Sequence, residues 1–233
     1  MKTFFSFLLT FFLSSSLLLA QQTNNLQGAY LGKGGDTNVL WLLVDGYLSH
    51  IYYTDDTYKG TTGGPYTFDG QKITLKVEYD DMTEDLSTIG QELTFPVSKD
   101  GDNLQTGGIT LVKQAAKNQD LDGLWHITGR KQGDNIVQIH QTGTRKTIKL
   151  LVDGYFQWMA IDPGAKTFSG TGGGHYTFID GKYGEHILFF SRDNSRVDAH
   201  LSFDGEIKNG EWHHSGLSSK GDPIYEIWSR DTQ

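Results

Sequence analysis

Histidine and tryptophan, the side chains that most often supply proton transfer and ring stacking, are concentrated in the second half of this 233-residue chain. Histidine titrates near neutral pH and serves as a general base, while a tryptophan face stacks on sugar rings and other flat ligands. The pattern predicts a ligand site in the second half; ordinary surface histidines and core aromatics are the alternative. Seven of the eight histidines and four of the five tryptophans follow residue 120: His126, His140, His175, His186, His200, His213, His214, Trp125, Trp158, Trp212 and Trp228.

Arginine and tyrosine complete a set of groups suited to an acidic saccharide. Arginine holds a carboxylate or sulfate through two parallel hydrogen bonds, and histidine or tyrosine moves protons. Such a set can remove the proton α to a uronate carboxylate and expel the neighbouring oxygen, while a cation stabilises the enolate-like intermediate. We expect the catalytic residues to be His175, Tyr176, His214 and Tyr155, and the substrate-binding residues to be Trp158, Trp212, Trp228, Arg192, Arg196, Arg230 and Glu226.

Strand alternation decides which of these side chains can share a site. In the last predicted strand, Ile224, Glu226, Trp228 and Arg230 project from one face. They could line a barrel interior, or Glu226 and Arg230 could face solvent around an exposed tryptophan.

Metal-binding patterns are weak in this sequence. The adjacent His213 and His214 point to opposite faces of a regular strand and cannot bind one ion together. The chain has no cysteine, no His-x-His and no His-Glu-x-x-His. We therefore predict neither a metal site nor a cofactor; a metal would need ligands from several strands.

Other catalytic motifs are missing or ambiguous. No Gly-x-Ser-x-Gly elbow precedes a helix, which argues against a nucleophilic hydrolase. The glycine run at 170–174 lacks the lysine and the helix of a phosphate loop, and indicates a tight bend at a barrel corner. A carboxylate pair for glycoside hydrolysis stays open among Glu185, Glu211 and Glu226, because the spacing singles out no pair.

The elements that position these groups come from an internal duplication. Leu-Leu-Val-Asp-Gly-Tyr at 42–47 returns at 150–155, and the block at 60–68 returns at 170–178, with offsets of 108 and 110 residues. Two separated blocks at nearly one offset indicate a tandem repeat. At matched positions Pro65 becomes His175 and His50 becomes Trp158. We therefore expect the first copy to be a scaffold and the second to carry the site.

Both copies consist of short alternating segments punctuated by glycine, as expected for strands joined by tight turns. About eight antiparallel strands in roughly 100 residues must close on themselves or stack, because open edges invite aggregation. We predict an all-β protein of two tandem antiparallel barrels, at 26–113 and 121–233, with a polar linker between them. The expected hairpin turns are Asp45-Gly46, Asp69-Gly70, Asp153-Gly154, Asp180-Gly181 and Asp204-Gly205.

The second copy opens with Leu121-x-Gly123-x-Trp125, which resembles the opening of a lipocalin-like barrel; the first copy has Tyr30 in place of the tryptophan. The whole mature chain resembles two-copy, lipocalin-like secreted proteins of Bacteroidota, similar in type to small oligosaccharide dehydratases and lyases of ulvan-degrading systems. The resemblance implies a carbon–oxygen lyase that acts on uronic-acid-containing oligosaccharides by proton abstraction and β-elimination. It transfers no catalytic residue. Two alternatives stay open: a non-catalytic binding protein for a sugar or lipophilic molecule, and side-chain-filled barrels that act through a surface interface.

The first twenty residues predict a secretory signal peptide. Lys2 precedes an apolar run, and Leu17-Leu18-Leu19-Ala20 offers a small-residue exit. We expect a secreted or periplasmic protein with no integral membrane segment after cleavage. Without cysteine, core burial alone must stabilise it. The net charge of −8 argues against nucleic acid and leaves an acidic oligosaccharide or other small molecule, held in a locally basic pocket, as the expected partner.

Overall fold

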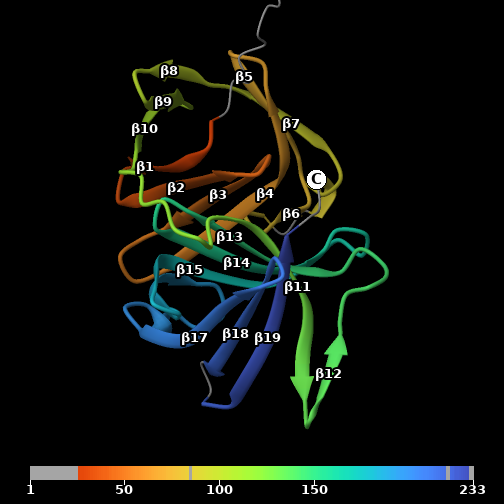
Figure 1. Cartoon of the computed structure of the whole chain (residues 1–233). Coiled ribbons are helices and arrows are strands. Elements are labelled where there is room, and N and C mark those ends of the chain that lie inside the picture. The colour runs from red at the N-terminus through yellow and green to blue at the C-terminus, as the bar shows by residue number, and fades with distance from the viewer. Residues whose placement is uncertain (1–25, 84–85, 219–220, 231–233) are drawn as a thin grey trace, which may run out of the picture.

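The computed structural model describes residues 26–83, 86–218 and 221–230, so the expected signal peptide at 1–20 lies outside the described residues. The described chain is all-β apart from two short 3-10 turns, η1 (Leu86–Thr88) and η2 (Asn194–Arg196). Antiparallel strands form two sheets that follow one another along the chain (Figure 1). The predicted all-β fold of two tandem barrels is confirmed. Among the described residues no helix has the length and apolar character to cross a membrane.

The first sheet is a nearly closed barrel of ten strands. Its order is β7-β5-β4-β3-β2-β1-β10-β9-β8, with β6 paired to β4. The two end strands, β7 and β8, are consecutive in the chain and separated only by Val97, so the sheet curls round on itself. The strands are β1 (Gly28–Gly34), β2 (Thr37–Val44), β3 (Tyr47–Tyr53), β4 (Tyr58–Phe68), β5 (Lys72–Lys76), β6 (Tyr79–Asp80), β7 (Glu92–Pro96), β8 (Ser98–Asp100), β9 (Asn103–Thr106) and β10 (Ile109–Lys113).

The second sheet is a closed barrel, because its first strand also pairs with its last. The order is β11-β13-β14-β15-β16-β17-β18-β19, and β12 extends from β11 as a projecting hairpin (Figure 1). The strands are β11 (Gly123–Gln132), β12 (Asn135–Gln138), β13 (Lys146–Val152), β14 (Tyr155–Asp162), β15 (Thr167–Ile179), β16 (Lys182–Phe190), β17 (His200–Lys208), β18 (Glu211–Leu217) and β19 (Pro223–Arg230).

The repeated Leu-Leu-Val-Asp-Gly-Tyr forms the contact between the barrels. Alternate side chains of β2 and β13 point into their own barrel, and the others form a shared apolar core with β3 and β14. Burial on both faces explains why β2 is a continuous apolar run from Val39 to Val44, whereas in β13 Lys149 interrupts the apolar run from Ile148 to Val152. The shared core includes Leu40, Leu42, Val44, Ile51, Ile148, Leu150, Val152, Met159 and Ile161.

Reciprocal hydrogen bonds from the two Asp-Gly turns link the barrels. The amide of Ala29 donates to Asp153 Oδ2 at 3.0 Å, and the amide of Leu124 donates to Asp45 Oδ2 at 2.8 Å. Both aspartates have positive φ, 50° at Asp45 and 52° at Asp153, as a hairpin of this kind requires. Each turn thus closes its own hairpin and caps the first strand of the other barrel.

Gln157 adds a polar contact at the centre of this interface. Its amide oxygen accepts from Ser49 of the first barrel. Its amide nitrogen donates to Thr171 at 3.0 Å and to Thr61, across the interface, at 3.3 Å. All four side chains are fully buried, so the satisfied network fixes the relative position of the barrels.

One expectation about glycine needs correction. The predicted turn at Asp204-Gly205 is wrong: both residues lie inside β17, and the turn follows at Asn209-Gly210. A Cβ on Gly205 would lie 2.9 Å from the Phe178 ring, so this glycine allows close ring packing.

The glycine run at 170–174 lies inside β15. Gly173 pairs with Phe189 and Gly174 with Ile187, so a bulge in the neighbouring strand β16 leaves Leu188 as the extra residue. A Cβ on Gly174 would lie 2.0 Å from the backbone oxygen of His186, so glycine is required by close backbone approach.

Candidate functional site

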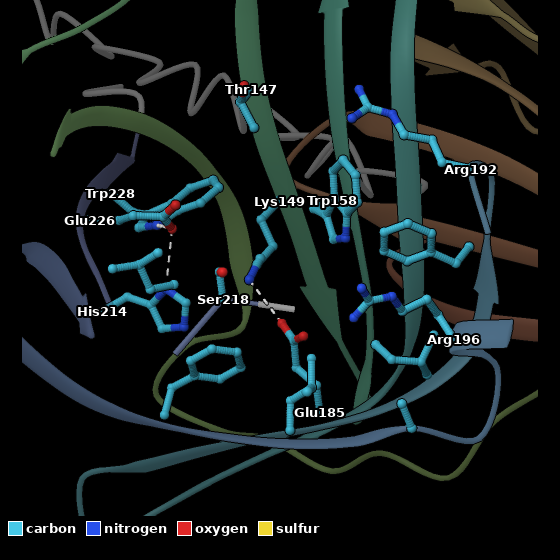
Figure 2. A pocket seen from close by; sticks show the side chains of 16 residues that line it. Thr147, Lys149, Trp158, Glu185, Arg192, Arg196, His214, Ser218, Glu226 and Trp228 are labelled. Carbon is cyan, nitrogen blue, oxygen red and sulfur yellow. Dashed lines mark hydrogen bonds and ion pairs between the residues drawn. The ribbon is translucent and has the colours of Figure 1, made fainter. Parts of the chain in front are cut away.

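The closed second barrel contains a cavity of about 360 Å³ that mixes charged and aromatic walls (Figure 2). Its charged and imidazole groups come from four different strands and the segment around η2, so only the closed barrel brings them together. The charged and imidazole lining is Lys149, Glu185, Arg192, Arg196, His214 and Glu226, and the aromatic lining is Trp158, Phe190, Phe203 and Trp228.

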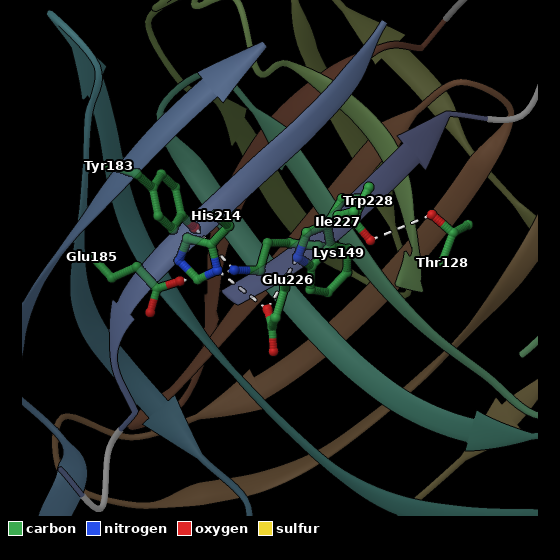
Figure 3. Close-up of polar contacts among 8 residues, drawn as sticks. All are labelled: Thr128, Lys149, Tyr183, Glu185, His214, Glu226, Ile227 and Trp228. Carbon is green, nitrogen blue, oxygen red and sulfur yellow. Dashed lines mark hydrogen bonds and ion pairs between the residues drawn. The ribbon is translucent and has the colours of Figure 1, made fainter. Parts of the chain in front are cut away.

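A buried ion pair lies at the inner wall of the cavity. Lys149 Nζ on β13 is 3.0 Å from Glu185 Oε1 on β16, and the two side chains are 5 % and 7 % exposed. The ammonium also lies over the rings of Tyr183, Trp212 and Trp228 at 4.8–5.3 Å. Figure 3 shows Lys149 with Tyr183 and Trp228. Paired charge and surrounding ring faces together compensate the loss of water around Lys149.

The second polar pair joins β18 to β19. His214 Nδ1 is 3.2 Å from Glu226 Oε2, and the indole Nε1 of Trp228 donates to the same oxygen at 3.0 Å. The other imidazole nitrogen, Nε2, is buried and has no hydrogen-bond partner among the described residues. Since a carboxylate only accepts, Nδ1 of His214 carries the proton and Nε2 keeps its lone pair.

Burial and charge keep this histidine neutral. Burial lowers the pKa of His214, Lys149 lowers it further, and the Glu226 contact opposes both without overcoming them. Burial raises the pKa of Glu226, but its contacts with His214, Lys149 and Trp228 bring that pKa below the ordinary value. A neutral imidazole held by an ionised carboxylate is the arrangement of an oriented general base.

The two arginines flank the cavity from the other side (Figure 2). Arg192 Nε donates to the backbone oxygen of Ser169 at 2.7 Å, which anchors the guanidinium group near the glycine-containing bend. Arg196 ends η2, whose N-cap is Asp193, and its Nε lies 3.6 Å from that carboxylate. Both cations are therefore positioned beside Trp158, where a flat anionic ligand could contact them.

The first barrel has different side chains at the positions matched to the cavity residues. The cross-strand pair Lys149 and Trp158 corresponds to Trp41 and His50. Glu185, which pairs with Tyr176, corresponds to Leu75, which pairs with Tyr66. The pair His214 and Glu226 corresponds to Thr106 and Ile109, the two residues that face each other across the last hairpin.

The polar interior is therefore specific to the second copy. Lys149 was missed from the sequence, and Glu185 was considered only as one of three possible carboxylates, although Lys149 directly precedes the repeated block and aligns with a tryptophan in the first copy. That substitution of a charge for an apolar side chain was a signal that comparing the copies could have found.

Six of the eleven expected site residues line the cavity: Trp158, Arg192, Arg196, His214, Glu226 and Trp228. Trp212 is fully buried behind the wall, with its ring beneath Lys149. Arg230 lies four residues beyond Glu226, where it stacks over Trp125 at 4.5 Å and donates to the backbone oxygens of Asp120 and Asp122. These two residues support the barrel from outside the cavity lining.

The remaining three expected catalytic residues do not line the cavity. Tyr176 points into the barrel but donates to Asp122, near Arg230. Tyr155 belongs to the core between the barrels, and its hydroxyl donates to Gln114 at 3.2 Å. His175 lies against the ring of Tyr155 with centroids 4.4 Å apart. The structure thus brings His175 and Tyr155 together, away from His214.

Comparisons with known proteins do not indicate which reaction this site could catalyse. The chain matches no protein-family model, and a search of curated proteins finds no match either.

Proposed function

We propose that the second barrel binds an acidic saccharide in its cavity and eliminates an oxygen substituent from it, with His214 as the general base. One observation carries the proposal: His214 lines the cavity as a buried, neutral imidazole whose Nε2 has no hydrogen-bond partner among the described residues, while Glu226 holds Nδ1. A buried nitrogen without a hydrogen-bond partner destabilises the fold. A general base that accepts a proton from the substrate is a functional reason for keeping such a nitrogen.

The reaction follows from this placement. Nε2 of His214 takes the proton from the carbon α to the uronate carboxylate, so that this C–H bond breaks and negative charge develops on the carboxylate oxygens. The adjacent C–O bond then breaks, a C=C bond forms, and the imidazolium returns the proton to the departing oxygen. Arg192, Arg196 and Lys149 supply the positive charge that stabilises the intermediate.

The lining also supports a saccharide as the ligand class. Three cations against two carboxylates, Glu185 and Glu226, give the cavity a positive balance when His214 is neutral, in a chain whose net charge is −8. Trp158 and Trp228 offer ring faces for stacking on a pyranose. The reaction type agrees with the sequence resemblance to oligosaccharide dehydratases and lyases.

The test is turnover of a panel of uronic-acid-containing oligosaccharides, ulvan fragments included, followed by the ultraviolet absorbance of the unsaturated uronate. His214→Gln should reduce kcat by about 10²- to 10⁴-fold, the range for loss of a general base. His213→Ala is the matched control, because the imidazole of His213 points outward to Tyr225. Wild-type protein that leaves the absorbance unchanged on every acidic glycan would overturn the proposal.

Binding without turnover is the second candidate, and the apolar part of the cavity favours it. Ile187, Leu201, Phe203 and Ile224 line the same space, and Lys149 is already paired with Glu185. A lipophilic or sugar ligand could be held by this wall alone. Calorimetry that shows tight capture without product, unchanged in His214→Gln, would identify a binding protein.

A further inference from the structure

We propose that the outer wall of the second barrel binds a divalent transition-metal ion of the Zn²⁺ type through His186, Asp198 and His200. The proposal does not depend on the proposed function, because His186 and His200 lie on the face of β16 and β17 opposite to the cavity and Asp198 lies in the turn just before β17. Strand alternation puts Glu185 and Ile187 into the cavity wall and His186 outside.

The three side chains already converge. One ligand atom from each lies within 4.8 Å of the other two. His186 Nε2 is 2.8 Å from Asp198 Oδ1, and the imidazoles of His186 and His200 are parallel, with centroids 4.2 Å apart. Tetrahedral Zn²⁺ with bonds of about 2.0–2.1 Å needs donor atoms about 3.3 Å apart, which rotations of exposed side chains can reach.

The duplication provides an independent argument. His186 and His200 form a directly opposed cross-strand pair, and the first copy has Lys76 opposite Glu92 at that place. The first copy thus has an opposite-charge pair where the second has two imidazoles. Charge attraction explains why Lys76 and Glu92 are adjacent, whereas a shared ligand would explain why the two imidazoles are.

Asp198 supports the same conclusion from its backbone. Its φ is 68°, in the left-handed region, and its amide donates to Ile187. The matched residue is Gly90, with φ 91° and an amide that donates to Val77. The first copy therefore has a glycine, which suits this backbone, where the second has an aspartate, for which the conformation is less favourable. The carboxylate of this aspartate points to His186.

Two imidazoles and one carboxylate select a borderline cation. This donor set suits Zn²⁺, Ni²⁺ or Cu²⁺ rather than Mg²⁺ or Ca²⁺, which prefer oxygen ligands. Three protein ligands leave a position open to water. Because Asp198 is 87 % exposed and His186 is 32 % exposed, the ion can enter from solvent.

The experiment is a calorimetric zinc titration of the full chain, purified without a polyhistidine tag and freed of chelator. We expect one equivalent per chain at pH 7.4. His186→Lys/His200→Glu places the first copy's own pair on the strands, so this variant should fold while its zinc affinity falls tenfold or more. Circular dichroism checks the fold, and His186→Ala and His200→Ala test each ligand separately.

Two controls make the result specific to this site. His213→Ala removes another partly exposed histidine that lies 3.9 Å from a carboxylate, and His214→Gln removes the cavity histidine; both should bind zinc as wild type does. Absence of wild-type binding below the millimolar range would overturn the proposal. Equal stoichiometry and affinity in wild type and in His186→Lys/His200→Glu would overturn it as well.

Discussion

Two single substitutions and one double substitution of the buried pair Lys149–Glu185 test how the second barrel tolerates charge in its interior. Lys149→Met leaves the Glu185 carboxylate, 7 % exposed, without its cation, and Glu185→Leu leaves the ammonium without its anion. Breaking a buried pair from one side costs about 3–5 kcal/mol. That is a large part of the about 5–15 kcal/mol by which a domain is stable.

The double variant Lys149→Met/Glu185→Leu should behave differently from either single variant. No charge is left unpaired, and replacement of a buried pair by apolar residues is often neutral or stabilising by about 1–4 kcal/mol. The first barrel already contains the apolar solution at the matched positions, Trp41 and Leu75, both almost fully buried. We therefore expect the double variant to regain most or all of the stability that each single variant loses.

Urea unfolding followed by tryptophan fluorescence measures this cycle, because Trp212 and Trp228 surround the ammonium. With an m-value of about 3 kcal/mol per molar urea, each single variant should lower the midpoint by roughly 1–1.7 M. The double variant should also lose binding of the proposed acidic saccharide while it keeps its fold. Additive losses, with the double variant less stable than either single one, would refute the view of a mutually compensated buried pair.

Two further predictions concern the interface and the first barrel. Asp45→Ala and Asp153→Ala should each reduce the free energy of unfolding by about 1–3 kcal/mol more than Asp180→Ala does, because each leaves a buried amide of the other barrel without its acceptor. Asp180 is the control, since it has a φ of 50° at an exposed turn. Equal losses in denaturant unfolding would contradict the linking role of Asp45 and Asp153. Burial lowers the pKa of His50 to about 3, so His50 contributes stability above its unfolded pKa of about 6.5 that is lost as the pH falls toward 3. Between pH 6.5 and 4.5 that loss is about 2.3 kcal/mol, and His50→Phe should flatten the acid limb of a stability–pH curve by this amount; parallel curves for the two proteins would show that folding does not lower the pKa of His50.

Local sequence signals predicted most of the strands, because alternation and Asp-Gly turns act over a few residues. Asp45-Gly46, Asp153-Gly154 and Asp180-Gly181 all adopt the positive φ expected of such turns. The same dipeptide at Asp204-Gly205 misled, since a glycine also serves where a ring from another strand packs onto the backbone. The sequence has no local mark that separates these two uses.

The candidate site was predictable in part. Face alternation correctly grouped Glu226 and Trp228, and separated His213 from His214, because both follow from the period of one strand. Lys149 and Glu185 lie 36 residues apart, and a single lysine or glutamate reads as a surface residue until the barrel closes around it. The metal-binding candidate was missed because strand pairing brings His186 of β16 to His200 of β17, and only Asp198-x-His200 is local.

The sequence by itself determined the fold class, the duplication and the copy in which to search for function. Each of these depends on patterns within a copy or between the two copies, such as the repeated Leu-Leu-Val-Asp-Gly-Tyr. Only the tertiary structure decided that this block lies between the barrels, that His214 and not His175 faces a cavity, and that His186 meets His200. The physical reason is that strand register and barrel closure set distances between residues far apart in the chain, and these distances depend on the whole core rather than on any one segment.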